Sequence, residues 1–210
     1  MVLDVYNIKG KKTKKQVKLP KEIFGISPNE HAVYLDVKQY LASQRLGTHK
    51  SKERGEVKGS RRKLRKQKGS GAARVGDIKN PIFRGGGRVF GPKPRKYQLK
   101  LNKKVKSLAK KSVFSSLYNK SNIIIIEDYK MDKPSTRAFN QILENFGIDN
   151  QKTLLTTNDN CKNIYLSSRN LKKSDVAQIE NVNTYQLMNT NKLIMMESSI
   201  KNLYSLKGVL

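Results

Sequence analysis

Apolar and polar positions alternate with a period of two at the amino-terminal end of the chain. Residues 3–7, "LDVYN", have the pattern of a strand, and a lysine-rich turn separates them from a second short strand expected near 16–19. The pattern then changes to the helical period. Ser27 is the predicted N-cap, Pro28 takes the first helical position, and Glu30 completes a capping box. The apolar positions of this predicted helix share one face: Val33, Val37, Tyr40 and Leu41.

Periodicity is absent from residue 46 to residue 98. Ten of the fourteen glycines lie between Gly47 and Gly91, among many lysines and arginines. An unstructured loop of this length is uncommon inside a compact domain unless it is functional or ordered by a partner. After it, Asn102 is placed to cap a second helix with a lysine-rich outer face. The inward positions of that helix are Val105, Leu108, Ala109, Ser112 and Val113.

Strands and helices alternate from residue 122 onward. Strands are predicted at 122–128, 152–157 and 192–197, and the run of four isoleucines in the first is typical of a strand buried on both faces. Helices are predicted at 134–147, 160–170 and 198–208, with Gly147 and Gly208 as stops. The first of these turns Phe139, Ile142, Leu143 and Phe146 inward. This order predicts an α/β fold with parallel strands, right-handed crossovers and helices on the sheet faces.

The charge is unevenly distributed along the chain. It has 44 Lys or Arg and 16 Asp or Glu, net +28, and residues 43–111 alone hold 24 basic and three acidic residues. Such an excess indicates a polyanionic partner, either nucleic acid or an anionic membrane surface. The membrane is the weaker alternative, because the longest apolar run, 123–126, has only strand length. With no signal or transit peptide evident and a single cysteine, Cys161, we expect a cytoplasmic protein without disulfide or zinc.

The segment 43–81 is too poor in apolar residues to fold alone. Only five of its 39 residues are Leu, Ile, Val or Phe, which cannot repay the conformational entropy of ordering. We therefore divide the chain into a globular α/β body, 1–45 with 99–210, and an extended basic loop, 46–98. A disordered charged segment is the plain alternative. Interspersed glycines, arginine mixed with lysine, and the two flanking helices favour a loop that binds RNA or DNA.

Sites of other kinds receive little support from the sequence. The stretch "GSGAAR", 69–74, follows no strand and lacks the third glycine of a dinucleotide fingerprint. Glu127 and Asp128 end a strand, but no phosphate-binding loop accompanies them, so an α/β nucleotide hydrolase is a minor alternative. His31 and His49 have no second metal ligand at a suitable spacing. We expect no enzyme activity, no metal and no cofactor.

A second glycine-rich stretch, 80–97, holds two aromatic residues beside three consecutive glycines. Phe83 and Phe90 flank the glycines, and two prolines stiffen the exit. Aromatic rings beside arginine offer stacking platforms for bases. Equally, both rings could anchor the base of the loop to the body. The sequence leaves these two alternatives open.

These stretches resemble a known family. In order and spacing, "RLGTHKSKERGEVKGSRRK", "QKGSGAAR" and "FRGGGRVFGPKPR" are similar to the loop of the fourth protein of the large ribosomal subunit, in its bacterial, universal form. The flanking "NEHAVYLDVKQYLASQR" and "LNKKVKSLAKKSVFSSL" resemble the helices on either side of that loop. The likeness covers essentially the whole chain and is most specific at 45–117.

The resemblance implies a fold and a function. The fold is a three-layer α/β domain whose mostly parallel central sheet is flanked by helices, with a long extended basic loop inserted between two helices. The function is that of a structural constituent of the large subunit, which binds its ribosomal RNA, supports assembly and acts as a monomer in the ribosome. Some family members also repress their own operon, so a free RNA-binding regulator is a further alternative.

The resemblance also implies site residues. The residues expected to bind ribosomal RNA are Arg45, His49, Lys50, Lys52, Arg54, Lys58, Arg61, Arg62, Lys63, Arg65, Lys66, Lys68, Arg74, Lys79, Arg84, Arg88, Lys93 and Arg95. The tip expected to line the constriction of the polypeptide exit tunnel, opposite the twenty-second large-subunit protein and beside the nascent peptide, is Arg65, Lys66, Gln67, Lys68, Gly69, Ser70 and Gly71. This chain departs from the family pattern at Leu64 and Arg65, where Pro and an aromatic residue are usual, and at Ala72, where a basic residue is usual.

Overall fold

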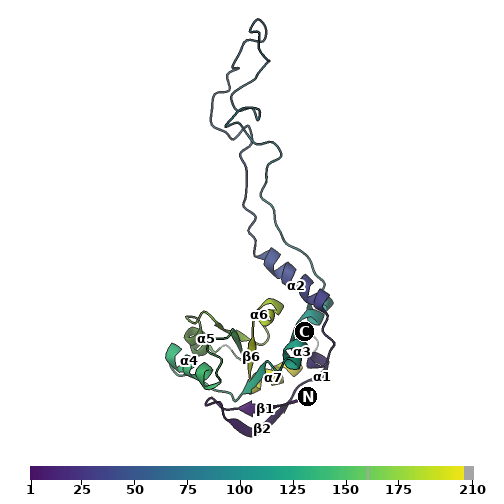
Figure 1. The fold of residues 1–210 in the computed structure, drawn as a ribbon, viewed down its shortest axis with the longest axis vertical. Helices are drawn as coiled ribbons and strands as arrows, with labels where there is room; N and C mark the ends of the chain where they lie inside the picture. The colour runs from purple at the N-terminus through teal and green to yellow at the C-terminus, as the bar shows by residue number, and fades with distance from the viewer. Residues whose placement is uncertain (160, 206–210) are drawn as a thin grey trace. The chain divides into compact units, whose positions relative to one another are not determined.

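The computed structural model describes residues 1–159 and 161–205, which separate into two compact units. The first, called the body below, consists of the described residues of 1–41 and 100–205. The second, the loop unit, is Ala42–Leu99. The ribbon in Figure 1 follows both units in chain order.

The body is built on one six-stranded sheet with the order β2-β1-β3-β6-β4-β5. β1 and β2 pair antiparallel, whereas the β1–β3, β3–β6, β4–β6 and β4–β5 pairs are parallel. The mostly parallel α/β fold predicted from the sequence is confirmed. The strands are β1 Val2–Tyr6, β2 Lys12–Lys18, β3 Ile123–Ile126, β4 Thr153–Thr157, β5 Ser174–Gln178 and β6 Lys192–Met196.

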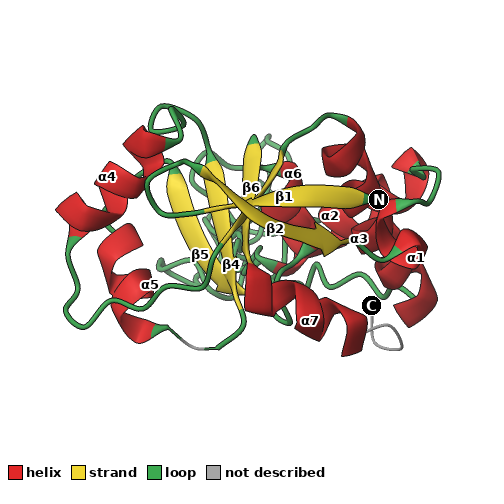
Figure 2. Cartoon of the chain, turned by 90° about the horizontal axis from the view of Figure 1, so that it is seen from below, coloured by secondary structure: helices red, strands yellow, loops and turns green. Residues whose placement is uncertain are grey.

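Helices cover the two faces of this sheet, which gives three layers. Figure 2 shows α4 and α5 grouped on one side of the strands and α1 and α3 on the other. The helices are α1 Lys21–Phe24, α2 Glu30–Ser43, α3 Lys103–Asn119, α4 Thr136–Asn145, α5 Lys162–Ser168, α6 Thr184–Met188 and α7 Glu197–Ser205. No helix in the described parts of the chain is long and apolar enough to cross a bilayer.

Alternation along the central strand β6 divides the core into two clusters. Leu193 and Met195 belong to one cluster, with Phe24 of α1 and Phe114 of α3. Ile194 and Met196, which alternate with them along β6, belong to the second cluster on the opposite face of the sheet. The helical members of that cluster include Phe139, Ile142 and Leu143 of α4 and Ile164 of α5. A strand buried on both faces explains why β3 and β6 are almost continuously apolar.

The helix ends predicted at Gly147 and at Ser27 can be compared with the structure. Gly147 has a φ of +65° just beyond α4, as predicted for a helix stop. The cap predicted at Ser27 is wrong: Asn29 Oδ1 accepts a 2.9 Å hydrogen bond from Ala32 N, and α2 begins at Glu30. The backbone N–H of Asn29 donates a hydrogen bond to Ser112 Oγ of α3, so a tertiary contact helps to fix the start of α2. The stop predicted at Gly208 lies outside the described residues.

Candidate nucleic-acid interface

The loop unit consists of two arms of chain that run side by side (Figure 1). No helix or strand lies between 44 and 99. A few backbone hydrogen bonds join the arms along their length. They run from Arg95 N to Gly47 O at 3.1 Å, from Ser51 N to Pro92 O at 3.1 Å, from Arg88 N to Lys52 O at 2.9 Å, and from Leu64 N to Gly76 O at 2.9 Å.

Almost nothing in the loop unit is buried. Among residues 42–99, all of which the structure describes, only Lys79 and Gly87 are buried. The two are joined by a 3.0 Å hydrogen bond from Gly87 N to Lys79 O. Leu46 is 86% exposed, so even an aliphatic side chain of the loop finds no apolar surroundings. Hydrophobic burial therefore contributes little to the conformation of this unit.

All three acidic residues of the loop unit are paired with basic side chains. Arg54 Nη2 lies 2.8 Å from Asp77 Oδ1, Lys93 Nζ lies 2.7 Å from Glu53 Oε1, and Lys50 binds Glu56. The hydrogen bond from Lys50 lowers the pKa of Glu56, and the bond to Glu53 raises the pKa of Lys93. The pairs Arg54–Asp77 and Glu53–Lys93 each connect one arm to the other.

These three ion pairs leave most of the positive charge of the loop available. The segment 42–99 contains 18 lysines and arginines, of which 15 have no carboxylate partner in the structure of this fully described segment. Most of them are exposed, including every residue from 61 to 74. Arginine binds phosphate in a bidentate manner, and lysine binds it as a point charge. The arrangement suits a surface rich in phosphate groups.

Two glycines allow the arms to approach closely. A Cβ atom added to Gly87 would lie 2.4 Å from the Arg54 backbone nitrogen, and one added to Gly47 would lie 2.0 Å from the Arg95 carbonyl oxygen. Gly47 also has a φ of +63°, which L side chains rarely adopt. No side chain fits at either position without moving the opposite arm.

Replacing Gly87 with alanine is therefore expected to separate the arms locally. The hydrogen bond from Arg88 N to Lys52 O should be lost, and the Arg88 amide should exchange with solvent about tenfold faster or more. Gly55→Ala is the matched control, because nothing lies within 4 Å of a Cβ at that position. Hydrogen exchange measured by mass spectrometry would test this. Equal exchange in the two variants would contradict the close packing at Gly87.

Tyr97 organises the part of the loop unit nearest to its two ends. The Arg45 guanidinium carbon lies 4.0 Å from the centre of the Tyr97 ring, and that of Arg95 lies 4.7 Å away. The His49 and Tyr97 ring centres are 5.9 Å apart. The Tyr97 ring thus contacts three predicted RNA-binding residues: Arg45 and Arg95 through cation–π contacts and His49 through a ring contact. Sequence reasoning missed Tyr97, although its position directly after Arg95 and Lys96 was a usable signal.

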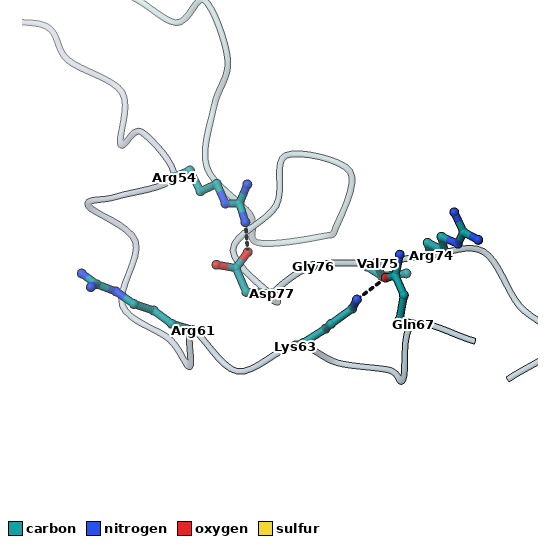
Figure 3. A pocket seen from close by; sticks show the side chains of 8 residues that line it. All are labelled: Arg54, Arg61, Lys63, Gln67, Arg74, Val75, Gly76 and Asp77. Atoms are coloured by element: carbon teal, nitrogen blue, oxygen red, sulfur yellow. Dashed lines mark hydrogen bonds and ion pairs between the residues drawn. The ribbon is translucent and has the colours of Figure 1, made fainter. Parts of the chain in front are cut away.

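A second group of predicted residues lines a shallow cavity of 430 Å³ farther along the loop (Figure 3). Its lining includes Arg54, Arg61, Lys63, Gln67 and Arg74. The Lys63 ammonium binds the Gln67 side-chain oxygen, and Arg54 turns to Asp77. Figure 3 shows Arg61 and Arg74 extending away from these pairs. The cavity is therefore rimmed by guanidinium and ammonium groups.

The two phenylalanines beside the glycine triplet have different surroundings. Phe83 is half-buried, whereas the Phe90 side chain is fully exposed and its φ is +52°. An exposed ring offers both faces for base stacking. A left-handed backbone at a phenylalanine is strained. The exposed ring of Phe90 is available for the stacking alternative, whereas Phe83 is partly covered within the loop unit itself.

The residues considered for other chemistry have structural roles. Asp128 Oδ1 accepts hydrogen bonds from Ser198 N at 3.0 Å and from Ser198 Oγ at 2.7 Å, at the start of α7. Glu127 lies 3.3 Å from Lys15 Nζ. Within residues 1–159 and 161–205, no three His, Cys, Asp or Glu side chains are placed to hold a metal ion.

Comparison with known proteins gives a consistent result over nearly the whole chain. A family model described as "Ribosomal protein L4/L1 family" matches residues 17–206. The chain is 52% identical over 205 residues to "Large ribosomal subunit protein uL4" of Christiangramia forsetii, covering 98% of this chain and 99% of that protein. The protein of the same name from Flavobacterium johnsoniae is 52% identical over 201 residues, covering 96% of both chains. That from Parabacteroides distasonis is 53% identical over 200 residues, covering 95% of this chain and 96% of that protein.

Proposed function

The chain belongs to the ribosomal protein L4/L1 family, and from this premise we propose that it is a structural constituent of the large ribosomal subunit. Its relatives carry the name of a large-subunit ribosomal protein. In this role the body serves as a rigid support and the loop unit as the main contact with ribosomal RNA. Because the loop unit would contact ribosomal RNA while the body supports it, we also propose a contribution to subunit assembly.

The observation that carries this proposal is the set of 15 basic side chains in the loop unit that lack an acidic partner. Where RNA helices pack together, their phosphates repel one another. A segment with little core of its own can follow the surface of folded RNA and neutralise those phosphates. Recognition would then depend on shape and on phosphate spacing rather than on a base code. Release of counterions should dominate the affinity, with a log-log salt slope of about −0.7 to −0.9 per phosphate contacted.

We further propose that the tip of the loop lines the polypeptide exit tunnel, where the twenty-second large-subunit protein lies opposite and the nascent peptide passes. Every residue of the tip is exposed, and Gly69 and Gly71 have φ values of +79° and +61°. Positive φ at two glycines is typical of a turn in the chain, and nothing lies within 4 Å of either Cβ position. Arg65 stands where the resemblance makes an aromatic residue usual, so this tip lacks one stacking platform.

A photo-crosslinker placed at Gln67 tests the position of the tip. In translating ribosomes it is expected to crosslink to nascent peptide or to tunnel RNA. The same group at Glu144, an exposed residue of α4, should give no crosslink to nascent peptide. Crosslinking of nascent peptide from Glu144 alone would contradict the assignment. Repression of its own operon stays a secondary proposal. If that role were the main one, most of the protein would stay outside large subunits during sedimentation at high salt.

A further inference from the structure

A groove of 740 Å³ lies in the body, where the sheet meets the ends of two helices. Tyr6 of β1 and Ile124 of β3 contribute from the sheet, Phe146 from the end of α4, and Tyr118 and Asn119 from the end of α3. The rings of Tyr6 and Phe146 meet edge to face, with centres 6.0 Å apart. Tyr6, Tyr118 and Phe146 are half-buried, so each keeps some surface toward solvent. The volume is in the range of sites that hold small organic molecules.

The turn between β1 and β2 is fixed beside this groove. Asn7 Oδ1 accepts hydrogen bonds of 3.0 Å from both Lys9 N and Lys11 N. Gly10 lines the groove with a φ of +75°, and a Cβ there would lie 2.6 Å from the Asn145 carbonyl oxygen. Asn145 Nδ2 donates a 3.0 Å hydrogen bond to Ile8 O. These contacts hold the turn against the last residue of α4.

The turn and the strand after it carry a concentrated positive charge. Residues 9–18 include six lysines and no acid. Lys12 lies 2.8 Å from Asp4 Oδ2, and Lys15 lies near Glu127 and Glu197. Lys9, Lys11 and Lys14 are exposed and have no carboxylate partner among the described residues. A polyanion at this edge of the sheet would gain favourable interactions with all three.

We infer that the β1–β2 hairpin and the adjoining groove form a second RNA-binding surface, separate from the loop unit. Lysines of the turn and of β2 bind the phosphates of an unpaired segment of large-subunit ribosomal RNA, and one base of that segment enters the groove beside Tyr6 and Phe146. Aromatic side chains next to a cationic ridge are the combination that binds single-stranded RNA by stacking and charge. This inference rests on the proposed function, which places the chain among ribosomal RNA.

The main competing occupant is a strand or loop of a neighbouring protein. β2 is an edge strand, and a free edge can pair with another chain. Its lysines oppose such pairing, because charged side chains on an edge strand disfavour the addition of a further strand. The observed charge therefore favours RNA over protein.

Crosslinking in assembled subunits distinguishes these occupants. A photo-crosslinker at Asn119, an exposed residue that lines the groove, is expected to attach to ribosomal RNA, whereas one at Gln141, exposed on α4, should do so several-fold less. Attachment of Asn119 to protein alone, or to nothing, would overturn the inference. If the Gln67 crosslinker reaches RNA while that at Asn119 does not, the proposed function stands and this inference falls. If the chain does not enter large subunits at all, both fall.

Binding of purified full-length protein to a large-subunit ribosomal RNA transcript gives an independent test. The variant Lys9→Gln, Lys11→Gln, Lys14→Gln is expected to lower the magnitude of the log-log salt slope by about 2, at 0.7 to 0.9 per lost contact. Its matched control removes three exposed lysines elsewhere in the body: Lys130→Gln, Lys133→Gln and Lys162→Gln. That control should keep the original slope. An equal change in both triple variants would assign the effect to net charge alone and refute a specific surface.

Discussion

Deleting residues 56–76 is expected to weaken binding to large-subunit ribosomal RNA by about a hundredfold or more, while the body unfolds at the same temperature within about 2 °C. The deletion removes eight lysines and arginines and a single acid. None of the deleted residues is buried, so the core of the body loses nothing. Arg54 and Asp77, on either side of the deletion, are joined by a 2.8 Å ion pair, so a Gly-Ser link can close the gap.

Titration of RNA binding against salt, together with calorimetry of the free protein, measures both halves of this prediction. If about six of the eight basic residues contact phosphate, the salt slope should decrease in magnitude by about 4 to 5. A control that replaces 56–76 with 21 Gly and Ser residues separates the effect of charge from that of length. Loss of cooperative unfolding in the deletion variant would contradict the separation of the chain into a self-sufficient body and a dependent loop.

Replacing Leu193 with alanine is expected to lower the melting temperature of the body, which the deletion of 56–76 should leave unchanged. Leu193 is fully buried on β6, between β3 and β4, in the cluster that contains Val5 and Phe114. Truncating such a leucine costs about 2 to 5 kcal/mol, a large part of the roughly 5 to 15 kcal/mol that stabilises a domain. At about 2 to 4 °C per kcal/mol, the melting temperature should fall by about 4 to 20 °C.

The matched control is Leu46→Ala, which makes the same change at a leucine that is 86% exposed in the loop unit. Its effect on the free energy of unfolding should stay within about 0.5 kcal/mol. Calorimetry or denaturant titration of both variants provides the measurement. Similar destabilisation by the two substitutions would show that the loop unit shares the core of the body, which the burial pattern opposes.

The sequence alone determined most of the alternation of strands and helices from 122 onward, because a buried strand such as Ile123–Ile126 and an amphipathic helix such as α4 place their apolar residues with different periods. It missed β5 and α6, which are short; β5 buries only Val176, so no apolar pattern marks it. The sequence also did not predict the order of the strands in the sheet. β6 is the last strand in the chain but lies between β3 and β4 in the sheet. An apolar run shows that a strand is buried, but it does not show which strands pair with it.

For the candidate site, the sequence determined that 46–98 is basic, glycine-rich and short of apolar residues, because these are properties of composition. Only the tertiary structure decided which charges remain available. Glu53 meets Lys93 and Arg54 meets Asp77 across the two arms, and Tyr97 gathers Arg45 and Arg95. Such pairings depend on how the chain returns on itself, and their free energies are too small for local sequence to specify the geometry that brings them together.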